Sequence, residues 1–266
     1  MSGERADFTA IMSLANFVIV SYPRTASTFL TLKLHSCSQL ICYSELFHKS
    51  EDAFSKSFYD DDFKLVKATW LGKKELNLAK LFRLRNKDFR KFLELVFCSP
   101  AIPVGFKIFP GQNDKAMRYL IKDKRLKKIF LIRDDMLRNF VSHKIAVKTG
   151  QWGRAPGQKA DLQRVEVGVK EFLIYAGSKL DSLKALENQC NADGQETLRL
   201  TCEGITADFP VDDIGEFLGV DLGDIQQEVA LQKQNPFSLK EMVTNYEELM
   251  TALEGTPWKR SLTGEA

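Results

Sequence analysis

Short apolar runs, separated by longer stretches with helical periodicity, constrain the fold of this chain more than any other feature. The runs lie at Phe17–Val20, Val104–Ile108, Ile129–Ile132 and, with more polar residues, Thr197–Leu200. A short apolar run without polar alternation is typical of a strand that is buried on both faces. The stretches between the runs are long enough for crossover helices, so this order predicts an α/β fold with a central parallel sheet and helices on both faces.

The stretches between the runs carry the spacing of helices. We expect helices over Ser27–Ser36, Glu75–Phe97, Lys115–Lys122, Met136–Lys148, Asp212–Leu218 and Lys240–Leu253. From Val165 onward, apolar residues recur every three or four positions as far as Leu183, which indicates a long core-facing helix. No linker rich in Gly, Ser or Pro interrupts the sequence, so we expect one domain over residues 1–266.

Charge, cysteine content and hydropathy exclude several classes of protein. The net charge of +3 is too small to indicate nucleic-acid binding on its own. The five cysteines form no Cys-x-x-Cys pair and the three histidines no His-x-x-x-His pattern, so we expect neither a disulfide framework nor a metal site. The sequence shows no signal-peptide pattern and no run of about 18 apolar residues. We therefore expect a soluble, cytoplasmic protein without a membrane span.

A loop rich in hydroxyl groups follows the first apolar run. It reads Arg24-Thr25-Ala26-Ser27-Thr28 and leads into the first expected helix. The first N–H groups of a helix have no internal partner and carry the positive end of the dipole, so this position suits a phosphate-like anion. An ordinary capped helix would explain Ser27 or Thr28, but not a cation at the front of the helix. The motif GxxxxGK[ST] is absent, which argues against a standard nucleoside triphosphate site.

A second cationic segment follows the Ile129–Ile132 run. Arg133 stands at the strand tip, and Arg138 and Ser142 lie four residues apart on one face of the next helix. Two guanidinium groups and a hydroxyl can hold a phosphate monoester. The alternative is a surface helix in which an acidic residue of its first turn pairs with Arg138.

Both segments resemble the sulfotransferases that use 3′-phosphoadenosine-5′-phosphosulfate (PAPS). Carbohydrate members carry R-T-G-S-T after the first strand, and this chain has Ala26 in place of the usual glycine. The family reads the 3′-phosphate of the donor with an R-D-x-x-x-R-x-x-S-like segment, in which the gap is one residue shorter than from Arg133 to Ser142. Either Arg133 or Arg138 is therefore the expected partner of that phosphate.

Three further segments are similar to the bacterial trehalose sulfotransferase group. Lys148–Trp152 resembles Q-T-G-x-W, Gly105–Ile108 resembles G-F-K, and Asn245–Leu249 resembles N-Y-E-E-L. The resemblance implies a P-loop-like three-layer fold in which residues 24–28, with the charge of Arg24, hold the 5′-phosphosulfate. It further implies direct in-line transfer without a metal, with adenosine 3′,5′-bisphosphate as the product. Nothing between residues 49 and 97 aligns with the family.

The same resemblance suggests which residue takes the proton of the acceptor. The segment Tyr43–Phe47 resembles P-E-E-Y-F, in which a glutamate is the proposed base, so Glu45 is the first candidate. His48 is the alternative, because animal cytosolic sulfotransferases use a histidine. His143 is expected to be structural. Lys107, at a strand end, either helps to hold donor or acceptor or is a plain lysine with a buried stem.

Two aromatic residues and a late loop complete the candidates. Trp70 and Trp152 are expected to pack in the core, with stacking on adenine or on a sugar ring as the alternative. The loop at Lys233–Asn235 corresponds in position to the basic lid that sulfotransferases often close over the 3′-phosphate.

The sequence thus favours a sulfotransferase that acts on a hydroxyl or nitrogen of a carbohydrate, glycolipid or small metabolite. A P-loop kinase-like phosphoryl transferase using ATP and Mg²⁺ is the alternative, and a non-catalytic binder on the same fold is a third reading. Relatives of this group can dimerise, which leaves a homodimer open.

Overall fold

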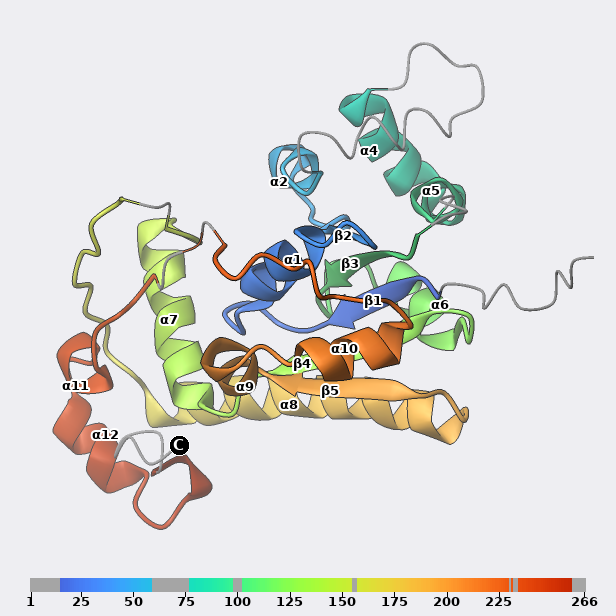
Figure 1. Cartoon of the computed structure of the whole chain (residues 1–266). Coiled ribbons are helices and arrows are strands. Elements are labelled where there is room, and N and C mark those ends of the chain that lie inside the picture. The colour runs from blue at the N-terminus through green and yellow to red at the C-terminus, as the bar shows by residue number, and fades with distance from the viewer. Residues whose placement is uncertain are drawn as a thin grey trace, which may run out of the picture.

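A parallel sheet forms the centre of the molecule. A computed structural model of the chain describes residues 15–58, 77–97, 102–154, 157–229, 231 and 234–259. The five strands are ordered β2-β3-β1-β4-β5 (Figure 1) and all neighbours pair in parallel. Their bounds are Phe17–Val20 (β1), Ile41–Tyr43 (β2), Val104–Ile108 (β3), Lys127–Ile132 (β4) and Thr197–Thr201 (β5). The predicted α/β fold with a central parallel sheet is confirmed.

Helices cover both faces of this sheet (Figure 1). One layer comprises α1 (Ser27–His35), α9 (Cys202–Ala207) and α10 (Val211–Leu218). The other comprises α6 (Asp114–Lys122), α7 (Met136–Thr149) and α8 (Val169–Ala192). The remaining helices are α2 (Glu51–Ser55), α4 (Leu78–Lys87), α5 (Phe89–Val96), α11 (Leu239–Met242), α12 (Tyr246–Ala252) and the 3₁₀ helix Pro257–Lys259. Among the described helices, none combines the length and apolar character that a bilayer crossing requires.

The strands divide their side chains between two hydrophobic cores. On β1, Val18 and Val20 pack with the α6–α7–α8 layer, whereas Phe17 and Ile19 pack with α1 and α10. This alternation follows from the two-residue period of a strand, and it explains why every residue of β1 is apolar. Gly105 of β3 lies beside Phe17, where a Cβ atom would stand 2.3 Å from the phenyl ring. The glycine of the Gly-Phe-Lys segment is therefore required by packing.

Three helix predictions differ from the structure. The predicted Glu75–Phe97 helix is wrong as a single element, because the chain breaks at Asp88, whose side chain caps α5. The predicted Lys240–Leu253 helix is likewise two short helices, α11 and α12. The long helix begins at residue 169, since Val165 instead forms a parallel bridge with Val243. In each case a local capping or bridging contact overrides the apolar periodicity.

The strand order creates a crevice at the carboxyl edge of the sheet. After β1 the chain turns toward β2, while after the neighbouring β4 it continues toward β5. Adjacent strands whose connections diverge in this way form a topological switch point, where ligands bind in open α/β sheets. Both cationic segments of the sequence lie at this switch point.

Candidate functional site

The loop after β1 has an unusual backbone. Arg24 has φ 70° and Ala26 has φ 59°, and they are the non-glycine residues with positive φ in the described chain. Each such position costs on the order of 1 kcal/mol without a glycine. Ala26 is also the N-cap of α1, where its side chain cannot accept a hydrogen bond, and no acidic residue occupies the first turn. The N–H groups at the start of α1 are thus left for an external anion.

Buried hydroxyl groups hold this loop against β4. Ser21 donates to the Leu131 carbonyl at 2.7 Å, and its hydroxyl lies 2.7 Å from that of Thr25. Thr25 donates in turn to the Tyr22 carbonyl at 2.9 Å and is fully buried. The Thr25 hydroxyl therefore stabilises the loop from inside, whereas Ser27 and Thr28 line a cavity.

The side chain of Arg24 joins the two strand ends. Its Nε donates to the Ser142 hydroxyl on α7 at 2.9 Å, and a terminal nitrogen donates to the Trp152 carbonyl at 2.6 Å. A cavity of about 630 Å³ surrounds these contacts, and we call it the β1–β4 cleft. Its lining also includes Ala26, Ser27, Thr28, Arg133 and Arg138. The two cationic segments of the sequence thus meet in one cavity at the carboxyl edge of the sheet.

Arg133 lies between the loop and α9. One terminal nitrogen donates to the Arg24 carbonyl at 3.0 Å, while Nε stands 3.7 Å from a carboxylate oxygen of Glu203. This buried Nε has no hydrogen-bond partner among the described residues. Glu203 also accepts from the backbone N–H groups of Asp134 and Asp135 at the start of α7. A carboxylate therefore already stands where a helix N-terminus and a guanidinium favour an anion.

Arg138 secures the segment that crosses over α7. A terminal nitrogen donates to the carbonyls of Asn235 at 3.3 Å and Phe237 at 2.7 Å. The Asn235 amide donates to the Ser142 hydroxyl at 3.1 Å, so the same hydroxyl accepts from two sides of the cleft. Gln234 and Asn235 line the cleft, and Lys233, the basic residue of the expected lid, lies outside the described residues.

The electrostatics of the cleft favour an anion. Burial and the charge of Arg133 lower the pKa of Arg24 to about 10. The same two causes, burial first, lower the pKa of Arg138. A lowered arginine pKa means that the charged form is destabilised by lost hydration and by a neighbouring cation. A bound phosphate or sulfate group would offset both causes.

A second polar cluster lies next to α1 and includes Glu45. Lys107 of β3 is 1 % exposed, donates to the Thr28 hydroxyl at 2.8 Å and stands 3.4 Å from Glu45 Oε1. Gln112 donates to Glu45 Oε2 at 2.7 Å. Burial lowers the pKa of Lys107, and the Glu45 carboxylate opposes that shift. These contacts connect the Glu45 carboxylate to the loop at Thr28.

The structure does not bring His48 into this cluster. Its Nδ1 accepts from the backbone N–H of Ser50 at 3.1 Å, next to the start of α2. His143 lies elsewhere, with its ring 5.7 Å from that of Trp152 and 5.4 Å from that of Tyr175. Burial, Lys179 and Arg24 lower the pKa of His143.

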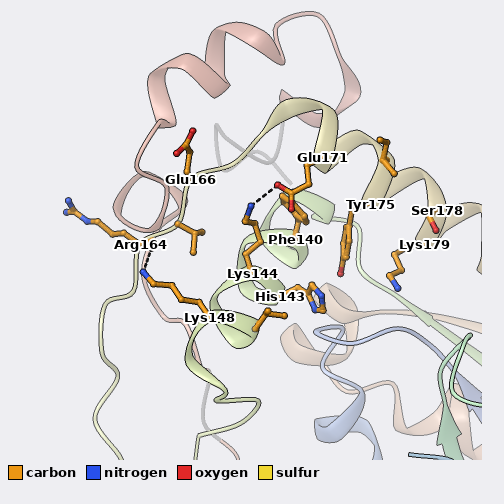
Figure 2. Close-up of a pocket in the computed structure, with 13 residues that line it drawn as sticks. Phe140, His143, Lys144, Lys148, Arg164, Glu166, Glu171, Tyr175, Ser178 and Lys179 are labelled. Atoms are coloured by element: carbon orange, nitrogen blue, oxygen red, sulfur yellow. Dashed lines mark hydrogen bonds and ion pairs between the residues drawn. The ribbon is translucent and has the colours of Figure 1, made fainter. Parts of the chain in front are cut away.

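A separate cavity of about 810 Å³ lies between α7 and α8 (Figure 2). Lys144 and Glu171 form an ion pair across it at 2.7 Å. On its inner side Tyr175 donates to Asn139 Oδ1 at 2.7 Å, and the Asn139 amide donates to the Pro23 carbonyl at 3.1 Å. This relay ties α8 through α7 to the loop that carries Arg24.

The expectations for the two tryptophans have different outcomes. Trp152 is 51 % exposed and lines the β1–β4 cleft, so the core-packing prediction is wrong for this residue. Its carbonyl is held by Arg24, which keeps the chain after α7 at the mouth of the cleft rather than in the core. Trp70 lies outside the described residues.

The sequence reasoning missed three polar residues of the site. Glu203 follows β5, and Gln112 follows β3 by four residues, so the rule that polar residues at strand ends gather at one edge could have identified both. Asn139 gives no such signal, because it reads as an ordinary polar position on α7. Its role depends on full burial, which the sequence does not reveal.

Comparison with known proteins identifies a similar solved structure. No family model matches the chain, and no curated protein matches it. Among solved structures, the chain is similar to the crystal structure of a sulfotransferase from Alicyclobacillus acidocaldarius. That likeness has a TM-score of 0.41 and 13% sequence identity, and it covers 94% of this chain and 95% of the other.

Proposed function

We propose that this chain is a PAPS-dependent sulfotransferase whose donor binds in the β1–β4 cleft. The observation that carries the proposal is the contact of Arg24 with Ser142, which brings two anion-binding segments from different strand ends into one cavity. A nucleotide with phosphate groups at both its 3′ and 5′ positions needs two such sites at once.

The residues of the cleft fit the two ends of this donor. At one end, the uncapped start of α1 and the charge of Arg24 suit the 5′-phosphosulfate. At the other, Ser142 and Arg138 offer a hydroxyl and a guanidinium for the 3′-phosphate. Arg133 lies between them with a buried Nε that lacks a hydrogen-bond partner among the described residues.

Glu45 is the proposed general base. When bound, the donor supplies a sulfuryl group, whose bond to the bridging oxygen breaks as the acceptor oxygen or nitrogen bonds to sulfur. Glu45 takes the proton of the acceptor, and its contacts with Lys107 and Gln112 fix the carboxylate for this role. Lys107, bonded to Thr28 at the start of α1, contributes positive charge where negative charge develops on the leaving oxygen.

The acceptor class follows from the resemblance rather than from the cleft. We propose a hydroxyl or amine of a carbohydrate, glycolipid or small metabolite. The described cysteines, at positions 37, 42, 190 and 202, are buried thiols, which suits a reduced compartment such as the cytoplasm.

A transfer assay with ³⁵S-labelled donor and a panel of sugars, glycolipids and phenolic or amine metabolites tests the proposal. We expect Arg24→Ala to lower turnover by about 100-fold or more, the effect of removing a group that stabilises developing charge. Arg118→Ala, on the exposed side of α6, is the matched control and should retain full turnover. Transfer of phosphate from ATP–Mg²⁺, with none of sulfate from the labelled donor, would instead support the kinase-like alternative.

A further inference from the structure

Arg85 of α4 is a buried cation without an acidic partner among the described residues. It is 4 % exposed. One terminal nitrogen donates to the carbonyls of Leu46 at 2.9 Å and His48 at 2.7 Å. Its Nε and the other terminal nitrogen donate to the Asn86 side-chain oxygen at 3.2 and 2.8 Å. Backbone carbonyls and one amide thus satisfy the fork of the guanidinium.

Burial of this charge opposes folding unless the charge is well satisfied. Burial lowers the pKa of Arg85 to about 10, and no carboxylate among the described residues offsets this shift. The rings of Phe54 and Phe82 lie 5.0 and 4.4 Å from the guanidinium carbon, which offsets part of the cost. An apolar residue at this position would pack between the same rings without that cost, so the two carbonyl contacts are the distinctive contribution of the arginine.

The two carbonyls belong to the turn that carries Glu45. Within this turn, the His48 N–H donates to the Glu45 carbonyl at 2.9 Å, and the Leu46 N–H to the Ser44 carbonyl at 3.2 Å. Arg85 therefore holds the backbone immediately after Glu45, while Lys107 and Gln112 contact the Glu45 carboxylate. Separate contacts thus fix the turn and the side chain that it carries.

We propose that Arg85 is a positioning residue, which fixes the 45–48 turn so that the Glu45 carboxylate stays aligned for proton transfer. This inference rests on the proposed function, because it takes Glu45 as the base. The inference assigns a role to α4, which lies beyond the β2 edge of the sheet (Figure 1). This helix belongs to residues 49–97, which do not align with the sulfotransferase family. The helix acts as a brace for the catalytic turn.

Hydrogen exchange tests the grip on the turn without any need for activity. We expect Arg85→Gln to speed amide exchange of residues 44–49 by about 10-fold or more, with little change elsewhere. Arg85→Lys keeps the charge but lacks the fork, so it should show a smaller increase. Lys128→Gln is the matched control, since Lys128 is likewise buried and donates to backbone carbonyls, but in β4, on the far side of β1 and β3 from β2. Unchanged exchange of the turn in both Arg85 variants would overturn the inference.

A double-mutant cycle tests the consequence for catalysis. We expect Arg85→Gln to lower kcat by about 10- to 100-fold, while affinity for adenosine 3′,5′-bisphosphate stays within about 2-fold. If Arg85 acts through Glu45, the double variant Glu45→Gln/Arg85→Gln should be no slower than Glu45→Gln alone. Additive losses would show that Arg85 acts through the fold in general, which overturns the positioning role. Absence of sulfuryl transfer by the unaltered chain would contradict the proposed function. The hydrogen-exchange experiment would still decide whether Arg85 holds the turn.

Discussion

Arg24 and Ser142 are separated by 118 positions in the chain, yet the Arg24 Nε donates to the Ser142 hydroxyl at 2.9 Å. The first residue follows β1 and the second lies on the helix that follows β4. Because β1 and β4 are neighbours in a parallel sheet, their carboxyl ends open into the same crevice. This contact therefore shows that the loop at residues 24–28 and the cationic segment at residues 133–142 form a single site.

We predict that Ser142→Ala weakens binding of adenosine 3′,5′-bisphosphate by about 10-fold or more, because hydrogen bonds to charged groups contribute about 1.5–3 kcal/mol. The Ser142 hydroxyl also accepts from Asn235, so its loss removes one of the contacts that hold Asn235 at the cleft. Calorimetric titration measures the change. Ser178→Ala, on the exposed side of α8, should bind as the unaltered chain does; equal affinity of both variants would contradict the assignment of Ser142.

The positive φ of Ala26 predicts a stabilising substitution. Ala26→Gly should raise the free energy of unfolding by up to about 1 kcal/mol, because glycine adopts φ 59° without the clash of a Cβ atom. Ala185→Gly, at an exposed position within α8, should lower the free energy of unfolding by about 1 kcal/mol. There the only effect of glycine is to raise the backbone entropy of the unfolded chain. Urea unfolding of both variants measures the change in the free energy of unfolding, which should be an increase for Ala26→Gly and a decrease for Ala185→Gly. A loss of stability in Ala26→Gly would mean that the left-handed conformation is not strained.

We predict that loss of the Lys107 proton sets the alkaline limit of activity. Its protonated form pairs with Glu45 and donates to Thr28, and burial lowers its pKa below the ordinary value of 10.5. The proton, and with it the positive charge, is therefore lost as pH rises through this lowered pKa, earlier than for an exposed lysine. In the unaltered chain we expect kcat to fall as the pH rises, with a midpoint below pH 10.5. We expect Lys107→Met to have a low kcat at every pH and to show no such fall. An identical alkaline limb in both proteins would contradict this role.

The relay from Tyr175 through Asn139 to the Pro23 carbonyl predicts a cost in stability. Asn139→Leu leaves the Tyr175 hydroxyl and the Pro23 carbonyl without partners, and each buried unsatisfied group costs about 1–3 kcal/mol. Tyr175→Phe removes one contact and should cost less. Denaturant unfolding measures both losses. Equal stability of Asn139→Leu and the unaltered chain would show that water replaces the relay.

Much of the fold could be predicted from local pattern. The apolar runs on β1, β3 and β4 reflect strands buried on both faces, and their shortness and β-branched or aromatic residues distinguish them from buried helix segments. By contrast, β2 has only three residues, too few for a periodic signal. The predicted third strand also begins too late, because Lys127 and Lys128 look like a solvated turn although Lys128 is fully buried within β4.

The site was less accessible to sequence reasoning. Arg24 and Ser142 could be named because each follows a strand end and topology brings such ends together. Arg85 could not, since its partners are backbone carbonyls in a distant turn, and carbonyls have no side-chain signature. Glu45 could be named from a resemblance, but its contacts with Lys107 and Gln112 depend on tertiary packing.

Titration of the unaltered chain with adenosine 3′,5′-bisphosphate tests the central claim most directly, because that nucleotide carries both phosphate ends and no reactive group. We predict saturable binding with one nucleotide per chain, unchanged by removal of Mg²⁺ and strongly weakened in Arg24→Ala. Binding of ATP–Mg²⁺ with no binding of the bisphosphate would contradict the claim, and so would a bisphosphate affinity that Arg24→Ala leaves intact.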